Sequence, residues 1–274
     1  MSRYRLWKSV AGATGKSFLF FVLWVATMVA LSLHYDLSLP ATWQLGFSSL
    51  DSVGALLVAL LMWRFVDRRP VRELFARCGR AGRCAGMAAL LALALSLCSI
   101  LLMLALDAFR VVGVTDRPAM AALALLALAP AAFFEEMAFR GYLLPVWQRA
   151  VGTHWAVAVT ALFFALLHGP GTDLTWVSCL NVYLAGILLA FIRLRCDIWA
   201  ATAFHFVWNA VQTVMGFNLS GNDIPGLLVL TSEEHGWISG GGYGIEGSVC
   251  TLIMLALAVS WLSLRPRRDC TLLP

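Results

Sequence analysis

Hydrophobic residues are gathered into long uninterrupted runs, and this pattern most constrains the fold of the chain. Eight runs are candidate membrane spans: 17–35, 50–66, 85–109, 119–147, 154–170, 174–192, 197–217 and 247–264. About 20 residues of helix cross the hydrocarbon core of a bilayer. Only 13% of the 274 residues are charged, whereas soluble domains average about 25%. The sequence therefore predicts an all-α, polytopic membrane bundle of about eight transmembrane helices.

Basic residues are distributed unevenly between the two sides that eight spans would create. One side receives Arg3, Arg5, Lys8, Lys16, Arg64, Arg68, Arg69, Arg72, Arg77, Arg80, Arg83, Arg149, Arg193, Arg195, Arg265, Arg267 and Arg268. The other side receives only Arg110 and Arg117. Because Lys and Arg are retained on the cytoplasmic face, we expect both termini to be cytoplasmic. The predicted location is a bacterial plasma (inner) membrane, and the placement of the net charge of +5 argues against nucleic acid as a partner.

Two segments depart from a simple pattern of spans and short loops. The run 119–147 is too long for one straight span and contains Pro130 and Pro145, so we expect a kink or an interfacial extension. The segment 218–246 is the one long loop predicted on the non-cytoplasmic side. Loops of this length in compact folds are often functional.

Ionisable residues inside the spans are the candidate functional residues, because a charge at mid-bilayer costs about 2.5–3.5 kcal/mol. Glu136 and Arg140 are four residues apart, which predicts an ion pair on one helical face. Glu135 points about 100° away from Glu136. It is therefore left without that partner and is a candidate general base.

Two later spans carry further polar residues. Phe164 precedes His168 by four residues near the end of the fifth run, and His205 precedes Asn209 by four residues in the seventh. Histidine can bind a metal or carry a proton, and an asparagine amide can donate to an oxyanion. Each pair alone fits an ordinary helix contact, but a carboxylate, two histidines and an amide together are sufficient for hydrolysis.

These residues resemble the motifs of the CPBP intramembrane proteases, also called the CAAX-protease and bacteriocin-processing family. That family carries EExxxR, FxxxH and HxxxN or HxxxD on successive membrane helices. Here the motifs are Glu135-Glu136-x-x-x-Arg140, Phe164-x-x-x-His168 and His205-x-x-x-Asn209. The resemblance covers residues from about 119 to 264, and a glycine-rich segment at 241–248 is also typical of bacterial members.

The resemblance implies a helical fold around a conical cavity. It also implies hydrolysis of a peptide bond in a membrane-associated protein or peptide within or beside the lipid bilayer. Residues 1–118 would form three N-terminal helices with a basic loop, residues 119–264 the catalytic domain, and residues 265–274 a short cytoplasmic tail.

The resemblance also assigns roles within the motifs. Glu135 and His168 would activate water, and His205 with Asn209 would hold the oxyanion. The remaining motif residues, Glu136, Arg140 and Phe164, would support the site.

Some alternatives remain open at the level of sequence. Glu135, His168 and His205 could bind zinc, but no HExxH motif is present. A glutamate-activated water fits the same residues and is the mechanism we favour, with no cofactor required. The simple topology places His168 nearer the outer surface than Glu135, so the two meet only if the fourth span is kinked or the boundaries differ. A non-catalytic scaffold or immunity protein of the same fold is the main competing function, and a proton-relay transporter is another.

Overall fold

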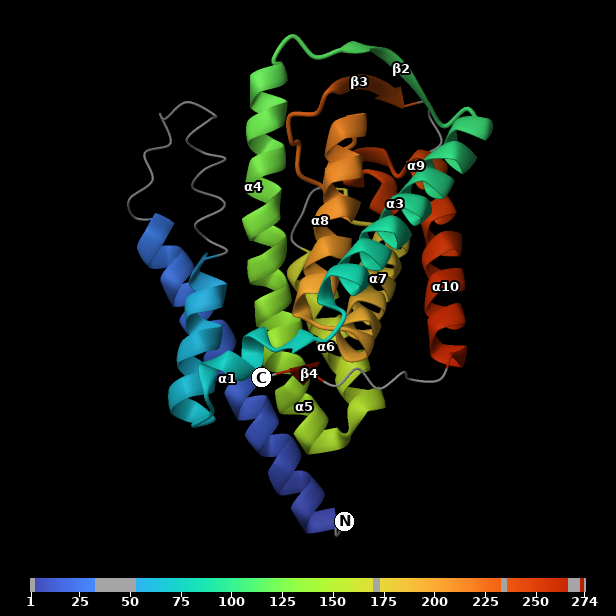
Figure 1. Ribbon diagram of the computed structural model, residues 1–274. Helices are drawn as coiled ribbons and strands as arrows, with labels where there is room; N and C mark the ends of the chain where they lie inside the picture. Colours follow the sequence, from blue (N-terminus) through green and yellow to red (C-terminus); the bar gives the residue numbers. More distant parts are fainter. Residues whose placement is uncertain (1–2, 33–52, 170–172, 233–235, 266–271, 274) are drawn as a thin grey trace.

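A bundle of helices forms the protein (Figure 1), and the all-α prediction is confirmed. The computed structural model describes residues 3–32, 53–169, 173–232, 236–265 and 272–273. The longer helices are α1 (Arg3–Ser32), Val53–Val66, α3 (Ala81–Ala105), α4 (Pro118–Glu136), α5 (Leu144–Val151), α6 (Thr153–Leu167), α7 (Trp176–Arg195), α8 (Ile198–Met215) and α10 (Val249–Leu264). The short helical elements are η1 (Met62–Val66), η2 (Val71–Phe75), η3 (Met137–Leu143), α9 (Gly236–Ser239), η4 (Gly241–Tyr243) and η5 (Ile245–Gly247).

The outside of the bundle is apolar, as an integral membrane protein requires. Within the described residues, four helices are long and apolar enough to cross a membrane: Tyr4–Ala30, Ala81–Ala105, Pro118–Val151 and Trp176–Arg195. Leu90, Leu126 and Leu257 are each more than half exposed on helix surfaces, where contact with lipid removes the cost of exposing them to water. The count of eight spans stays a prediction, and residues 33–35 and 50–52 of the first two runs lie outside the described part.

Two short antiparallel sheets are additions that the hydrophobic pattern did not predict. Strand β2 (Phe109–Val114) pairs with β3 (Leu228–Ser232), and β1 (Arg77–Cys78) pairs with β4 (Leu272–Leu273). The third run was expected to remain helical to residue 109, but α3 ends at Ala105 and Asp107 adopts a positive φ of 51°. β3 lies within the long loop 218–246 and satisfies the backbone groups of β2, which makes a strand favourable there. Residues 233–235 of that loop lie outside the described part.

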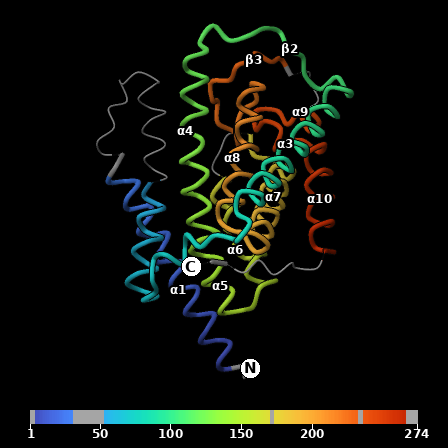
Figure 2. Tube along the Cα trace, in the orientation of Figure 1, coloured from blue at the N-terminus to red at the C-terminus, as the bar shows by residue number. Residues whose placement is uncertain are grey.

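The long fourth run is helical from Pro118 to Val151. Figure 2 shows this trace passing from α4 into α5. Pro130 lies inside regular helix, whereas the irregular segment is the π-helical η3, directly before α5 and its Pro145. A proline inside a helix lacks an N–H and crowds the carbonyl four residues earlier, so the wider turn accommodates Pro145. Such π-helical insertions frequently occur at functional sites.

Helix packing places the motif-bearing helices at the centre. α8 packs against both α3 and α4, and α6 packs against α7. Helix α3, from the predicted N-terminal region, therefore supports a helix that carries a predicted site motif. The division into 1–118, 119–264 and 265–274 stays a prediction, and most of the tail lies outside the described residues.

Candidate active site

Three helix segments bring the predicted site residues together. Glu135 lies at the end of α4, His168 caps the C-terminus of α6, and His205 lies in the first half of α8. Helix α6 has 15 residues, a length of about 22 Å, which is shorter than the roughly 30 Å hydrocarbon core. Glu135 Oε2 and His168 Nε2 are 3.9 Å apart, so the two residues meet, and α6 ends at Leu167, before the predicted end of its run at residue 170.

The base of the site is a fully buried ion pair. Arg140 donates from Nη1 to Glu136 Oε1 at 2.8 Å, and the two side chains are 1% and 0% exposed. Arg140 also donates from Nη2 to the carbonyl of Gly186 on α7 at 3.1 Å, and its guanidinium lies 4.4 Å from the ring centroid of Phe164. A buried charge needs a partner and further hydrogen bonds to offset its desolvation. Arg140 has both, so it ties η3 to α6 and α7.

Glu135, the neighbour of Glu136 in the chain, faces both histidines. Its Oε2 is 3.9 Å from His168 Nε2 and 3.9 Å from His205 Nε2. Both distances are too long for direct hydrogen bonds, and Oε2 makes no hydrogen bond within the described part of the chain. The Glu135 side chain is 27% exposed, whereas Glu136 is fully buried. The adjacent glutamates therefore have different environments, one structural and one accessible from a cavity.

The other ring nitrogen of each histidine is fixed by an acceptor. His168 Nδ1 lies 2.8 Å from the carbonyl oxygen of Phe164, and His205 Nδ1 lies 3.0 Å from Glu136 Oε1. Carbonyl and carboxylate oxygens only accept, so each Nδ1 carries the proton and each Nε2 is directed at Glu135. The Phe164 ring packs against both imidazoles, with centroid distances of 4.3 Å and 6.0 Å. Phe164 thus orients both rings.

A cavity of about 600 Å³ gives access to these groups. Glu135, His168, His205 and Asn209 all line it. The remaining wall comes from α4, Phe164 of α6, α7, Phe204 and Trp208 of α8, and the segment at residues 219–224. Asn209 lies one turn beyond His205 on α8, so both side chains face the same space as Glu135.

Glu246 also lines the cavity and is a residue that the motif analysis did not select. It is 8% exposed and accepts hydrogen bonds from Trp208 Nε1 (2.8 Å), Gln212 Nε2 (3.4 Å) and Ser220 Oγ (2.6 Å). The backbone carbonyl of Glu246 accepts from Asn181 on α7 at 2.7 Å. Glu246 therefore joins α8, α7 and the cavity wall. The signal in the sequence was an acid directly before the last apolar run, inside the glycine-rich segment.

We expect Glu246→Ala to destabilise the protein, because it leaves the indole N–H of Trp208 without its acceptor and removes one of the two acceptors of Gln212 Nε2. Each donor that stays buried without a partner costs about 1–3 kcal/mol. Glu246→Gln keeps an acceptor at the same place and should lose less. Thermal melts in detergent compare the two variants, and equal melting temperatures for both would contradict the bridging role.

The residues fit a zinc site only in their chemistry. Glutamate and two histidines are ligands that zinc accepts, and two ligand atoms in a tetrahedral site lie about 3.4 Å apart. Here both distances from Glu135 Oε2 are 3.9 Å. Within the described ranges, no group of three or more His, Cys, Asp or Glu side chains is close enough to hold a metal ion. As arranged, the described residues of the site do not fit a metal ion.

Comparison with known families gives a match that overlaps this site. Residues 117–211 match the family described as type II CAAX prenyl endopeptidase Rce1-like. This segment is similar to that family. The matched segment contains every site residue predicted from the three motifs, and the resemblance to the CPBP proteases is confirmed at this level. Glu246 lies beyond the matched residues. No curated protein matches the chain.

Proposed function

We propose that the protein is an intramembrane endopeptidase that hydrolyses a peptide bond in a membrane-associated protein or peptide. The observation that carries this proposal is the convergence of Glu135 Oε2 and the Nε2 atoms of His168 and His205 at 3.9 Å in a cavity. Two atoms that each lie about 2.8 Å from one water oxygen are 3.9 Å apart when the angle between them is near 90°. The spacing therefore suits groups that act through a shared water and not on each other.

The first step is attack by water. Glu135 accepts a proton from the water as its oxygen forms a bond to the scissile carbonyl carbon, and the carbonyl π electrons move onto oxygen. His168 assists as an acceptor, because its Nδ1–H is held by Phe164 and its neutral Nε2 has a free lone pair.

The second step is stabilisation and collapse of the tetrahedral intermediate. His205 donates from Nδ1 to Glu136, so as an imidazolium it also donates from Nε2 to the oxyanion. Asn209 supplies a neutral N–H beside it. The carbonyl re-forms, the C–N bond breaks, and Glu135 returns its proton to the departing amine. The products are a carboxylic acid and an amine, and no oxidant or cofactor is consumed.

The test is cleavage of a peptide library by the purified full-length protein in detergent. The library spans membrane-adjacent segments, and Glu135→Gln, matched for folding by thermal melt, is the inactive partner. Products formed by the wild type and not by Glu135→Gln support the endopeptidase. Equal product formation by both proteins contradicts it. Binding of library peptides without any cleavage favours the alternative of a non-catalytic scaffold or immunity protein of the same fold.

We expect a strong chelator to leave the rate of peptide cleavage unchanged. The reaction uses a carboxylate, two imidazoles and an amide, and the spacing of the carboxylate and imidazoles is wider than a zinc site requires. The measurement is the cleavage rate after prolonged dialysis against chelator, with and without added zinc. Loss of activity that added zinc restores would replace the glutamic mechanism with a metal-dependent one.

Asn209→Ala is expected to lower kcat by about 100-fold or more, since loss of one oxyanion donor typically costs about 10²–10³ in kcat. Asn209 is half-buried and lines the cavity, so the melting temperature should stay close to that of the wild type. Steady-state kinetics and a thermal melt measure the two quantities. Full activity in Asn209→Ala would remove this residue from the mechanism.

A further inference from the structure

Within the described residues, the cavity lining contributed by α4 and α8 runs from the site toward one end of the bundle. On α4 its lining runs from Glu135 back to Ala124, a rise of about 16 Å along the helix. On α8 its lining runs forward from His205 to Asn209, and it then reaches Asn222 and Asp223, which are exposed. The end of α8 and strand β3 flank these residues in sequence, and both lie at the upper end in Figure 1.

The opposite direction is closed by packed side chains. The residues that follow Glu135 toward α5 are all fully or almost fully buried, and none of them lines the cavity: Glu136, Met137, Ala138, Phe139, Arg140, Tyr142 and Leu143. The ring of Phe139 packs edge-on against Phe164 with a centroid distance of 5.1 Å. The guanidinium of Arg140 lies 4.4 Å from the centroid of the same Phe164 ring. A polypeptide therefore reaches Glu135 from the end that carries Asp223.

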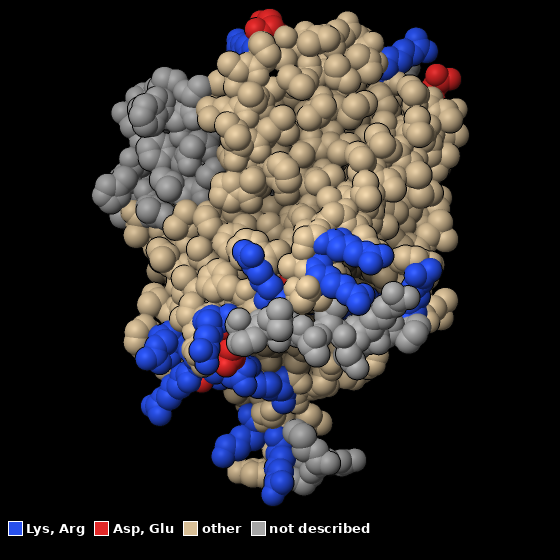
Figure 3. Space-filling view, viewed as in Figure 1, with Lys and Arg blue, Asp and Glu red and all other residues tan. Residues whose placement is uncertain are grey.

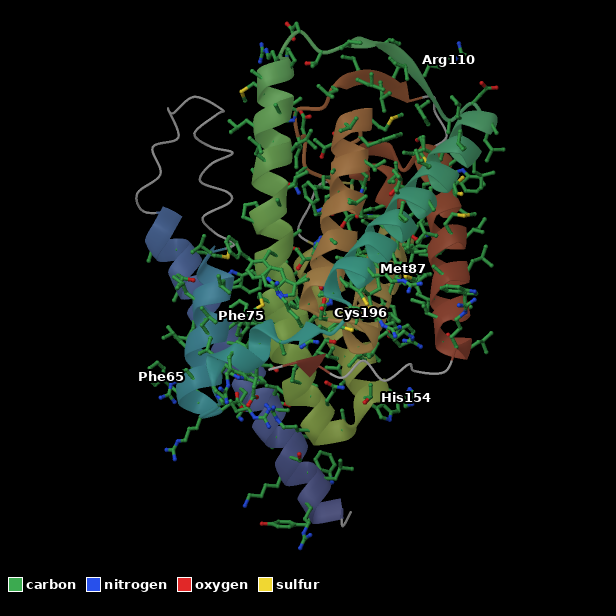
Figure 4. The ribbon with its side chains drawn as sticks, viewed as in Figure 1. Phe65, Phe75, Met87, Arg110, His154 and Cys196 are labelled. Carbon is green, nitrogen blue, oxygen red and sulfur yellow. The ribbon has the colours of Figure 1, made fainter. Side chains whose placement is uncertain are left out.

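The closed end is the strongly basic one. Figure 3 shows Lys and Arg gathered at the lower end of the molecule, with few at the upper end. Figure 4 places His154, at the start of α6, near this lower end, and Arg110, in β2, at the upper end. The described basic residues of the lower end belong to the start of α1, the segment 64–83, α5, the end of α7 and the end of α10. In a membrane protein such an end is retained in the cytoplasm.

We infer that the cavity opens on the non-cytoplasmic side, so that the site acts on the non-cytoplasmic flank of a membrane-anchored polypeptide. A cytoplasmic tail would meet the buried layer formed by η3 and could not reach Glu135. The apolar wall contributed by α4, with Ala124, Ala127 and Leu128, suits the last apolar residues of a substrate at the membrane surface. The reaction in this inference rests on the proposed function, whereas the side of access does not.

Accessibility of introduced cysteines tests the side of access without any assay of activity. Asp223→Cys lies at the mouth of the cavity, and Arg72→Cys, in η2, is the matched exposed site at the basic end. A membrane-impermeant maleimide is added to right-side-out and to inverted membrane vesicles, and labelling is read above that of the parent protein with its native cysteines. Val114→Cys, exposed on β2, repeats the upper-end measurement if Asp223→Cys does not fold.

The expected result is labelling of Asp223→Cys in right-side-out vesicles only and of Arg72→Cys in inverted vesicles only. The reverse pattern would overturn the inference. A second arm presents one cleavable segment on either flank of a single-span reporter, with Glu135→Gln as the inactive control. Cleavage of only the non-cytoplasmic reporter supports the substrate class, and cleavage of only the cytoplasmic reporter refutes it. The expected labelling without cleavage of either reporter would contradict the endopeptidase while leaving the side of access established.

Discussion

Glu135→Gln is expected to lower kcat/KM for peptide cleavage by about 10²–10⁴-fold, the range typical for loss of a positioned general base. Glutamine has nearly the shape of glutamate but cannot take a proton from water at neutral pH. The variant should fold normally, because Glu135 Oε2 makes no hydrogen bond within the described residues and the side chain is partly exposed. Initial rates on the best library peptide, with a thermal melt for each protein, measure the effect.

Glu135→Asp provides the matched control for this prediction. It keeps the carboxylate but shortens its reach to the water shared with His168 and His205, so its activity should fall between those of the wild type and Glu135→Gln. Loss of activity together with a large fall in melting temperature would instead assign Glu135 a structural role. Unchanged activity in Glu135→Gln would exclude Glu135 as the base.

Hydrophobic periodicity and helical spacing were sufficient to predict much of this arrangement. The long apolar runs predicted the helical bundle because a bilayer requires the backbone groups to be satisfied inside each span. The four-residue spacing predicted the ion pair of Glu136 and Arg140. In the structure Arg140 Nη1 lies 2.8 Å from Glu136 Oε1. The same spacing placed Glu135 on a different face, and this residue is the one directed into the cavity.

The features that the sequence did not predict depend on contacts between distant segments. His168 meets Glu135 just past the end of α6, and hydropathy alone extends that run beyond the end of the helix. The second contact of His205, with Glu136, joins residues 69 positions apart. The side chain of Glu246 interacts with residues 26 to 38 positions earlier in the chain, and Glu246 lies beyond the family match. Strands β2 and β3 each lack a partner until the chain folds, so neither segment alone indicates a sheet.

Glu136→Gln is expected to destabilise the protein by about 3–5 kcal/mol, the typical cost of removing one partner of a buried ion pair. Arg140 is 1% exposed, and in this variant its guanidinium would donate hydrogen bonds to neutral acceptors alone, the new amide oxygen and the carbonyl of Gly186. His205 would lose the carboxylate that holds its Nδ1–H. Thermal and chemical unfolding in one detergent, with Glu135→Gln as the neighbouring control, measure the loss.

The double variant Glu136→Gln with Arg140→Met separates an unpaired charge from a general loss of packing. If the uncompensated guanidinium causes the instability, removing it should recover part of the loss, since replacing both members of a buried pair by uncharged groups is often nearly neutral. The recovered protein should still cleave slowly, because His205 then lacks the carboxylate partner that favours donation from both ring nitrogens. A double variant less stable than Glu136→Gln would show that Arg140 acts mainly through its contacts with Phe164 and α7. An unfolding curve for Glu136→Gln equal to that of Glu135→Gln would show that the adjacent glutamates do not divide structural and catalytic roles, and it would place Glu136 among the candidates for the base.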